Sequence, residues 1–384
     1  MCNNIIFETD MYGHHLEYLH HLHIMASNDK DNQYYFIVPS TFQDASKKLH
    51  WEKSSNIEFV FYRETHLEKL NNASLLKAAY YKSKFLRNYV KKYQAKNVFL
   101  ISLMLYVPFI IFFLPSYCKV SGIVYRFYLY EWHKMSSLKK GLNVIRYWML
   151  SHFSCFNKVL ILNDKSVSIV LNKLFKTNKF LYLPDPAFFP NYAPKNVREE
   201  LKVAEDQNLF LHFGMLDYRK GTDLILKALK NIESSDLQKC VFVFAGMVSE
   251  SFRDVYHKLI KEVESKARIV IIERFCSFEE IADLCFSSDY LLLPYKDTMQ
   301  SSGVIGYCSK FNVAAIASNT GLLRKLVKRY DLGITCELSS PEKIYKVIRN
   351  LEMKRNISLR YCNEHTVESF LDVISTSFTY ESEF

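Results

Sequence analysis

Short apolar runs alternate with longer helix-like stretches along most of this chain, and this alternation restricts its fold more than any other feature. In the first half, strand-like runs fall at residues 4–8 (NIIFE), 34–38, 57–62, 97–104, 122–127 and 158–163. Helical patterns lie between them, most clearly at residues 14–26 and 72–93. Strands that alternate with helices predict parallel sheets joined by right-handed crossovers. The expected class is therefore α/β, with doubly wound sheets.

The second half repeats this pattern more regularly. Strands are expected at residues 209–213, 241–245, 269–272, 290–293 and 313–317. Helices are expected near residues 223–231, 251–266, 278–286, 304–309, 321–328 and 341–351. Glu342 lies in the first turn of the last helix, where a carboxylate is favourable. Two such series predict two sheets, one in each half of the chain.

A proline-marked segment, LPDPAFFPNYAP at residues 183–194, separates the two series and is typical of a domain boundary. We expect an N-terminal Rossmann-like domain over residues 1–185 and a C-terminal Rossmann-like domain over residues 186–363. An amphipathic C-terminal helix within residues 364–384 is expected to lie back across the first domain. If the two domains face one another, both sets of strand carboxyl ends line one cleft, where open α/β sheets bind ligands.

Composition indicates a globular chain with a preference for anionic partners. The net charge is +10, which leaves nucleotides, nucleic acid and anionic membrane surfaces open. The nine cysteines form no CxxC pair and no His/Cys cluster at metal-ligand spacing, which favours a reduced, cytoplasmic protein with no metal. The first residues, MCNN, lack the basic and apolar regions of a signal peptide.

Two segments raise the question of a membrane. Residues 98–114 (VFLISLMLYVPFIIFFL) are seventeen uncharged residues, near the lower limit for a spanning helix. Pro108 interrupts this run, so we favour a buried strand followed by a short buried helix, with the spanning helix as the alternative. Residues 138–147 (LKKGLNVIRY) mix basic and apolar residues at helical spacing, as in a surface-lying membrane helix or an ordinary solvated one.

The strongest candidate site is the segment LFLHFGMLDYRKGTDLIL at residues 209–226. A strand-like run ends at Gly214, a loop carries Arg219 and Lys220, and a helical pattern begins at Thr222. Two cations and a helix N-terminus then meet at one point, an arrangement that binds anions and most often phosphate. An ordinary strand–helix unit with solvated basic side chains is the alternative.

The order and spacing of several motifs resemble the GT-B-fold glycosyltransferases of family 4, retaining enzymes that use nucleotide-sugar donors. The matching segments are MYGHHLEYLHHL (11–22), LPDPA (183–187), FGMLDYRKG (213–221), FAG (244–246), SSDYLLLPY (287–295), QSSGVIGYCSKFNVAAIAS (300–318) and TGLLRKLV (320–327). The resemblance implies the GT-B architecture, two Rossmann-like domains that face a central cleft.

The resemblance also implies roles for individual residues. Lys220 matches the family lysine that holds the donor diphosphate, where the departing nucleotide gains negative charge. The family's partner arginine falls at Met215, so Arg219 is expected to replace it. A second phosphate cradle is expected from the backbone and hydroxyl groups of Gln300, Ser301, Ser302 and Gly303. A small-residue turn without a ligand is the alternative there.

Further donor contacts are implied at both domains. Gly13 and His14 are expected to approach the diphosphate or the donor sugar, with His14 counted among the catalytic residues. Gly214 is expected to lie against the donor, and Arg274 and Phe275 to flank the nucleobase.

One departure from the family pattern concerns two glutamates that usually hold the donor sugar and ribose. Their positions fall near Met299 and at Tyr307, so Gln300 or Asp297 would have to serve instead. We expect a retaining, metal-independent transferase without a cofactor. It would move a sugar from a nucleotide diphosphate to a glycan or lipid-linked acceptor in cell-surface polysaccharide biosynthesis. No nucleic acid partner is expected, and peripheral contact with an anionic membrane stays open. The alternative is a catalytically silent module that binds nucleotide or a partner enzyme.

Overall fold

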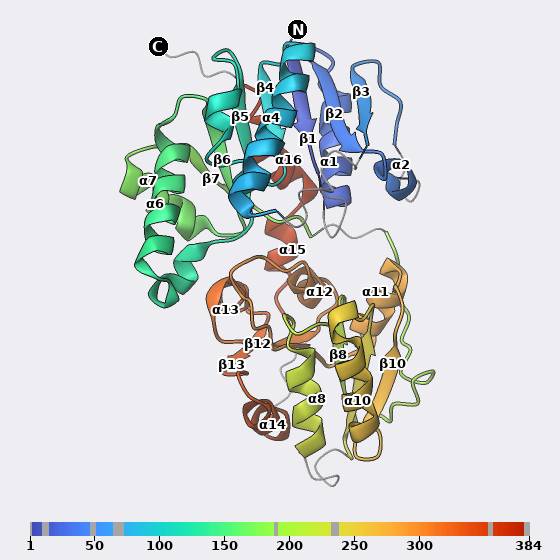
Figure 1. Cartoon of the computed structure of the whole chain (residues 1–384). Helices are drawn as coiled ribbons and strands as arrows, with labels where there is room; N and C mark the ends of the chain where they lie inside the picture. The colour runs from blue at the N-terminus through green and yellow to red at the C-terminus, as the bar shows by residue number, and fades with distance from the viewer. Residues whose placement is uncertain are drawn as a thin grey trace. The chain divides into compact units, whose positions relative to one another are not determined.

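The computed structural model describes residues 2–9, 15–46, 51–63, 73–187, 191–231, 238–351 and 356–379. The chain divides into two compact units. Unit 1 comprises Met1–Asp185 and Val367–Phe384, and unit 2 comprises Pro186–Thr366. Each unit is built on one parallel sheet flanked by helices (Figure 1).

Unit 1 contains a seven-stranded sheet in the order β3-β2-β1-β4-β5-β6-β7. Its strands are β1 (Asn3–Phe7), β2 (Gln33–Pro39), β3 (Ile57–Tyr62), β4 (Asn97–Leu100), β5 (Lys119–Val124), β6 (Phe156–Leu162) and β7 (Phe180–Leu183). Its α-helices are α1 (His15–Asn28), α2 (Phe42–Ala45), α4 (Leu75–Tyr93), α5 (Ile110–Phe113), α6 (Ser137–His152), α7 (Lys165–Phe175) and α16 (Val367–Ser375). Two 3₁₀ segments, η2 (Leu103–Leu105) and η3 (Tyr128–Lys134), complete the described elements.

The strand order of unit 1 reverses between β1 and β4, which are paired in parallel at the centre of the sheet. Right-handed crossovers then place α4, α6 and α7 on one face of the sheet and α1 on the other. Figure 1 shows α4 in front of the sheet and α16 behind it. The helix α16 packs against α1 and β7, so the end of the chain is part of unit 1.

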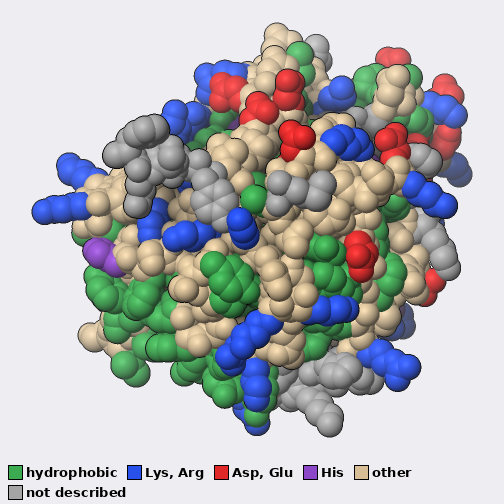
Figure 2. Space-filling view, turned by 90° about the horizontal axis from the view of Figure 1, so that it is seen from above, with side chains coloured by type: hydrophobic (Ala, Val, Ile, Leu, Met, Phe, Trp, Pro, Cys, Tyr) green, Lys and Arg blue, Asp and Glu red, His purple; other side chains and the backbone are tan. Residues whose placement is uncertain are grey.

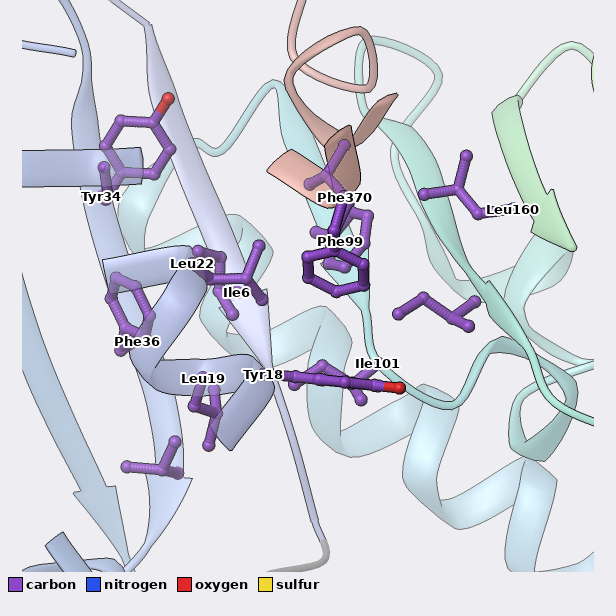
Figure 3. Close-up of a cluster of buried hydrophobic side chains, with 14 of the residues drawn as sticks. Ile6, Tyr18, Leu19, Leu22, Tyr34, Phe36, Phe99, Ile101, Leu160 and Phe370 are labelled. Carbon is purple, nitrogen blue, oxygen red and sulfur yellow. The ribbon is translucent and has the colours of Figure 1, made fainter. Parts of the chain in front are cut away.

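A continuous hydrophobic core joins α1, α16 and the sheet of unit 1. Phe370 of α16 is fully buried, and its ring lies 4.9 Å from that of Tyr18 in α1. Figure 3 shows Phe370 beside Phe99 of β4, with Ile6 of β1 close by. Full burial of a side chain as large as Phe contributes roughly 1.5–3 kcal/mol, so α16 is an integral part of this core.

Unit 2 contains a six-stranded parallel sheet in the order β10-β9-β8-β11-β12-β13. Its strands are β8 (Asn208–Phe213), β9 (Cys240–Ala245), β10 (Arg268–Ile272), β11 (Tyr290–Leu293), β12 (Ala314–Ser318) and β13 (Gly333–Cys336). Its helices are α8 (Thr222–Asn231), η4 (Glu250–Phe252), α10 (Arg253–Val263), α11 (Phe278–Ser287), α12 (Val304–Lys310), α13 (Gly321–Arg329), α14 (Pro341–Arg349) and α15 (Arg360–Glu364). The strand order reverses between β8 and β11, which is where open α/β sheets bind ligands.

The expected strands of both halves are present, with shifts of a few residues at their ends. The run at 97–104 ends as a strand at Leu100, and the run at 122–127 begins and ends three residues earlier, as β5. Strands β7 and β13 were not predicted. Residues 98–114 form β4, η2 and α5 rather than one continuous helix. None of the helices in the described ranges is long and apolar enough to span a membrane.

Candidate functional site

The end of β8 and the loop that follows it bring backbone and a lysine unusually close together. Gly214 has a φ of +99° and donates its N–H to the carbonyl of Ala245 over 2.9 Å. A Cβ atom at this position would lie 2.3 Å from the Nζ of Lys220. Glycine is therefore required here both for the backbone conformation and for the approach of the lysine.

Lys220 is held at this point by one contact of its backbone and one of its side-chain ammonium group. Its backbone N–H donates to Oδ1 of Asp217 over 2.7 Å, and its Nζ donates to the carbonyl oxygen of Phe213 over 2.9 Å. The side chain is only 8% exposed. Its Nζ also lies 5.7 Å from the ring centroid of Tyr295, which follows β11. The ammonium group is thus fixed between the two central strands of unit 2.

Burial makes this ammonium unusual in its acidity. The pKa of Lys220 is lowered to about 8, chiefly by desolvation and then by the neighbouring charge of Arg219, while Asp217 partly offsets both. A buried cation with few compensating charges is expensive, and such groups are concentrated at sites that bind or transform ligands. An anion placed beside Nζ would stabilise the charged form.

A buried histidine ties this loop to the neighbouring strand. His212 of β8 makes two ring contacts, through Nδ1 to the carbonyl of Leu292 (2.8 Å) and through Nε2 to Oγ1 of Thr222 (2.9 Å). Burial lowers the pKa of His212 to about 4, so the ring is neutral near pH 7. The neutral ring donates from Nδ1 to the carbonyl and accepts the Thr222 hydroxyl, which fixes the start of α8 against β11.

The opposite side of Lys220 is formed by Tyr295 and the turn that follows it. Ser302 donates its hydroxyl to the Tyr295 hydroxyl over 3.4 Å, and Ser318 donates to the Tyr295 carbonyl over 2.9 Å. Burial raises the pKa of Tyr295 to about 12. The four residues of the expected cradle, Gln300, Ser301, Ser302 and Gly303, are half-buried and lead into α12. Ser302 therefore belongs to the same group of side chains as Lys220.

Arg219 is adjacent to this group but is more exposed. Its carbonyl accepts the backbone N–H of Lys296 over 2.9 Å, and its Nε lies 3.6 Å from Oδ2 of Asp217. The Nζ of Lys296 is 2.7 Å from Oδ1 of the buried Asp223 at the start of α8. Three basic side chains therefore gather around the end of β8, and two aspartates hold their positions.

Arg274 and Phe275 follow β10, two strands away from β8. Nη1 of Arg274 donates to Oε2 of Glu280 over 2.9 Å, and this pairing raises the pKa of the guanidinium. Glu280 also closes a capping box with Ser277 at the start of α11. Phe275 is largely exposed. The structure thus engages Arg274 locally at α11, while Gly13 and His14 lie outside the described residues.

The positions of the family glutamates and arginine carry no charge in this structure. Met299 is buried, and the ring of Tyr307 packs against that of Phe213 at 5.2 Å. Met215 is half-exposed beside the loop. Within the described ranges, no group of three or more His, Cys, Asp or Glu side chains could hold a metal ion. The site is therefore cationic, with Lys220 as the most buried of its three basic side chains.

Sequence reasoning named Gly214, Lys220 and Ser302 among its candidates and did not name Tyr295 or His212. The structure places Gly214, Tyr295 and Ser302 around the side chain of Lys220, while His212 fixes the start of α8 from the core. A histidine inside an otherwise apolar strand run was the available signal for His212. Tyr295 could not be distinguished from the other aromatic residues of the core.

Residues 194–366 match the family model described as "Glycosyl transferases group 1". The match lies within unit 2 and covers less than half of the chain. The matched region contains Gly214, Lys220 and the turn at residues 300–303, so the whole cationic site lies within it. The comparison with curated proteins returned no match.

Solved structures with the same fold match almost the full length of the chain. HepE from Anabaena, solved with UDP and glucose, has a TM-score of 0.68 and 12% identity, over 98% of this chain and 99% of HepE. WaaG, a glycosyltransferase of lipopolysaccharide biosynthesis, has a TM-score of 0.61 and 14% identity, over 100% and 95%. Sucrose-phosphate synthase from Thermosynechococcus elongatus has a TM-score of 0.65 and 11% identity, over 100% and 96%. The two units of this chain have the GT-B fold of these proteins.

Proposed function

We propose that this protein is a retaining, metal-independent glycosyltransferase that uses a nucleotide diphosphate sugar as donor. The observation that carries the proposal is the buried ammonium of Lys220, held between the carboxyl ends of β8 and β11. The match to the group 1 family model and the glycosyltransferases among the similar structures support the class of reaction.

The chemistry assigns Lys220 to the leaving group. When the bond between the sugar and the diphosphate breaks, negative charge develops on the departing phosphate. The ammonium of Lys220 neutralises that charge, and Arg219 and the hydroxyl groups of the turn at residues 300–303 add to it. The acceptor hydroxyl attacks the anomeric carbon, and its proton passes to the leaving phosphate, so that no separate base is required.

The donor and the acceptor follow from the similar proteins. Because HepE binds UDP and glucose in its solved complex, UDP-sugars are the first donors to test. WaaG acts in lipopolysaccharide biosynthesis, which supports a glycan or lipid-linked acceptor and a role in cell-surface polysaccharide synthesis. Arg274 and Phe275 are assigned to the nucleobase on the resemblance alone.

A second candidate function is favoured by the residues at the glutamate positions. Met299 is buried, and Tyr307 packs on Phe213, so neither can accept a hydrogen bond from a ribose or sugar hydroxyl as a carboxylate does. A chain that keeps the diphosphate site but not these carboxylates fits a silent module that binds a nucleotide diphosphate or a partner enzyme.

Calorimetric titration with UDP, GDP and ADP, paired with an assay for donor hydrolysis and transfer, separates the two functions. Binding together with release of sugar from a UDP-, GDP- or ADP-sugar supports the transferase. Binding without turnover of any donor supports the silent module. Loss of binding in Lys220→Ala but not in Lys227→Ala, an exposed lysine of α8, assigns that binding to the site described here. If none of the nucleotides binds, the transferase and the nucleotide-binding form of the silent module both fail.

A further inference from the structure

One face of unit 1 exposes large apolar side chains where a solvated helix normally carries polar ones. The helix α6 buries Asn143 and Tyr147 on its inner side. Its outer side exposes four large apolar side chains, each 45–75% accessible: Leu138, Leu142, Ile145 and Trp148. They are spaced three or four residues apart and therefore form one stripe along the helix.

The apolar stripe continues onto the neighbouring helix α7. The ring of Trp148 stacks on that of His152 at 5.0 Å, and His152 lies edge-on to Phe175 at the end of α7, 6.4 Å away. The outer side of α7 exposes three more aliphatic side chains, 52–63% accessible: Ile169, Val170 and Leu174. Scattered apolar residues on a surface are normal, but a contiguous patch of this kind marks an interaction site.

Basic residues surround this patch almost without acidic ones. Residues 73–184, which contain α4 to α7, include eighteen Lys and Arg residues and only two acidic residues, Glu131 and Asp164. Asp164 is buried, where it caps the start of α7 by accepting the N–H groups of Ser166 and Val167. Among the described residues, no carboxylate forms a salt bridge with Lys139, Lys140, Arg146, Lys165 or Lys173.

The opposite face of the same sheet has the opposite character. The helix α16, which packs against α1 there, carries Glu368 and Asp372, and both line a shallow groove with Met25 and Asn28 of α1. Figure 2 shows hydrophobic side chains gathered at the lower left of that view and most Asp and Glu side chains in its upper part, whereas Lys and Arg side chains lie in both parts. The face with the gathered hydrophobic side chains therefore carries few acidic ones in this view.

We propose that the outer face of α6 and α7 docks on a membrane surface that carries anionic lipid headgroups. The apolar stripe enters the boundary between headgroups and acyl chains, with Trp148 at the depth that tryptophan prefers. The surrounding lysines and arginines contact the anionic headgroups. Charge complementarity selects this occupant, because an apolar patch next to cations that no carboxylate neutralises fits a surface of uniform negative charge. The proposal does not depend on the sugar donor.

Sedimentation with vesicles of stated composition tests this surface. We expect the protein to bind vesicles of phosphatidylcholine with about 30% phosphatidylglycerol, and not vesicles of phosphatidylcholine alone. The double variant Lys139→Gln/Lys140→Gln is expected to weaken binding roughly 30-fold, because each basic residue near such a surface raises the affinity by roughly fivefold. Binding should also raise and blue-shift the tryptophan emission, and Trp148→Phe should remove that change.

Two further variants control for folding and for charge alone. Arg324→Gln/Lys328→Gln removes the same charge from exposed positions of α13 in unit 2, and its vesicle binding should match that of the unaltered protein. Leu142→Ser/Ile145→Ser keeps every charge, and its binding should fall as well. Equal binding to neutral and anionic vesicles, or an equal loss in the α13 variant, overturns the proposal. So does a dimer that dissociates in Leu142→Ser/Ile145→Ser without vesicle binding, because the patch is then an interface between two copies.

Discussion

The two sheets have the same strand order at their centres but opposite chemistry at the ends of their central strands. In unit 2, β8 is followed by the buried cation Lys220. In unit 1, β1 is followed by Glu8, which is 1% exposed and pairs with Nδ1 of His15 at 2.9 Å. A second acidic contact lies nearby, where the Tyr18 hydroxyl donates to the buried Asp185.

This contrast separates what topology decides from what the residues decide. The reversal of strand order places the loops after the two central strands side by side in each sheet. It says nothing about the charge of those loops. A cationic edge suits a diphosphate, whereas carboxylates and tyrosines suit the hydroxyl groups of a sugar. The four predictions below test this division of roles between the units.

The largest effect is expected from Lys220→Ala. Removing a preorganised, desolvated cation should weaken nucleoside diphosphate binding by at least about 100-fold and abolish turnover. Calorimetry measures the affinity, and chemical denaturation checks that the free energy of unfolding does not fall. Affinity that changes less than threefold would show that the cationic edge of unit 2 is not the diphosphate site.

Tyr18→Phe is expected to act on stability and not on nucleotide binding. The change removes the hydroxyl that donates to the buried carboxylate of Asp185, so the free energy of unfolding should fall by about 1–3 kcal/mol. Tyr192→Phe in unit 2 removes a more accessible hydroxyl bonded to Asp283 and should cost less. Urea unfolding measures both variants. Loss of nucleotide affinity in Tyr18→Phe would end the assignment of diphosphate to unit 2 alone.

The pH dependence of nucleotide binding should follow Lys220. Its pKa is lowered to about 8, so the ammonium is present below that pH and is lost as the pH rises through it. Affinity for a nucleoside diphosphate should therefore be nearly constant up to about pH 7, fall roughly twofold by pH 8 and then fall by up to about tenfold per unit. Lys220→Arg keeps its charge over this range, and its profile should be flat. A flat profile in the unaltered protein contradicts the assignment.

The smallest effect is expected from Arg219→Ala. The guanidinium is partly exposed and lies 3.6 Å from Asp217, and exposed charges contribute little. Affinity for the diphosphate should fall by about two- to fivefold, as measured by calorimetry beside Lys220→Ala. A loss above about 50-fold would mean that Arg219 takes the place of the arginine missing at Met215.

Most of the fold could be predicted because buried parallel strands are short, continuous apolar runs. The two strands that were missed lack this signature for different reasons. Phe180–Leu183 is a short run whose last residue begins the proline-marked segment, whereas Gly333–Cys336 is a four-residue strand at the edge of its sheet with partly exposed side chains. The early end of β4 at Leu100 could not be predicted either, because the apolar run continues into η2 without a change of composition.

The site could be predicted only where it is continuous in sequence. Gly214 and Lys220 are six residues apart in one loop, so their contact follows from the strand–loop–helix pattern. Tyr295 reaches Lys220 from a different strand, and nothing in its own neighbourhood indicates that contact. The pairing of Glu8 with His15 was likewise missed, because Glu8 is the last residue of an apolar run and reads as its polar end.

The placement of α16 in unit 1 has a consequence for folding during synthesis on the ribosome. Unit 2 is continuous in sequence, whereas the core of unit 1 is closed by Phe370, which the ribosome adds after all of unit 2. Domains fold largely as units during synthesis. Unit 2 can therefore complete its sheet while the core of unit 1 still lacks α16. Tyr18 and Phe99 of the nascent first half therefore stay uncovered until α16 has been synthesised.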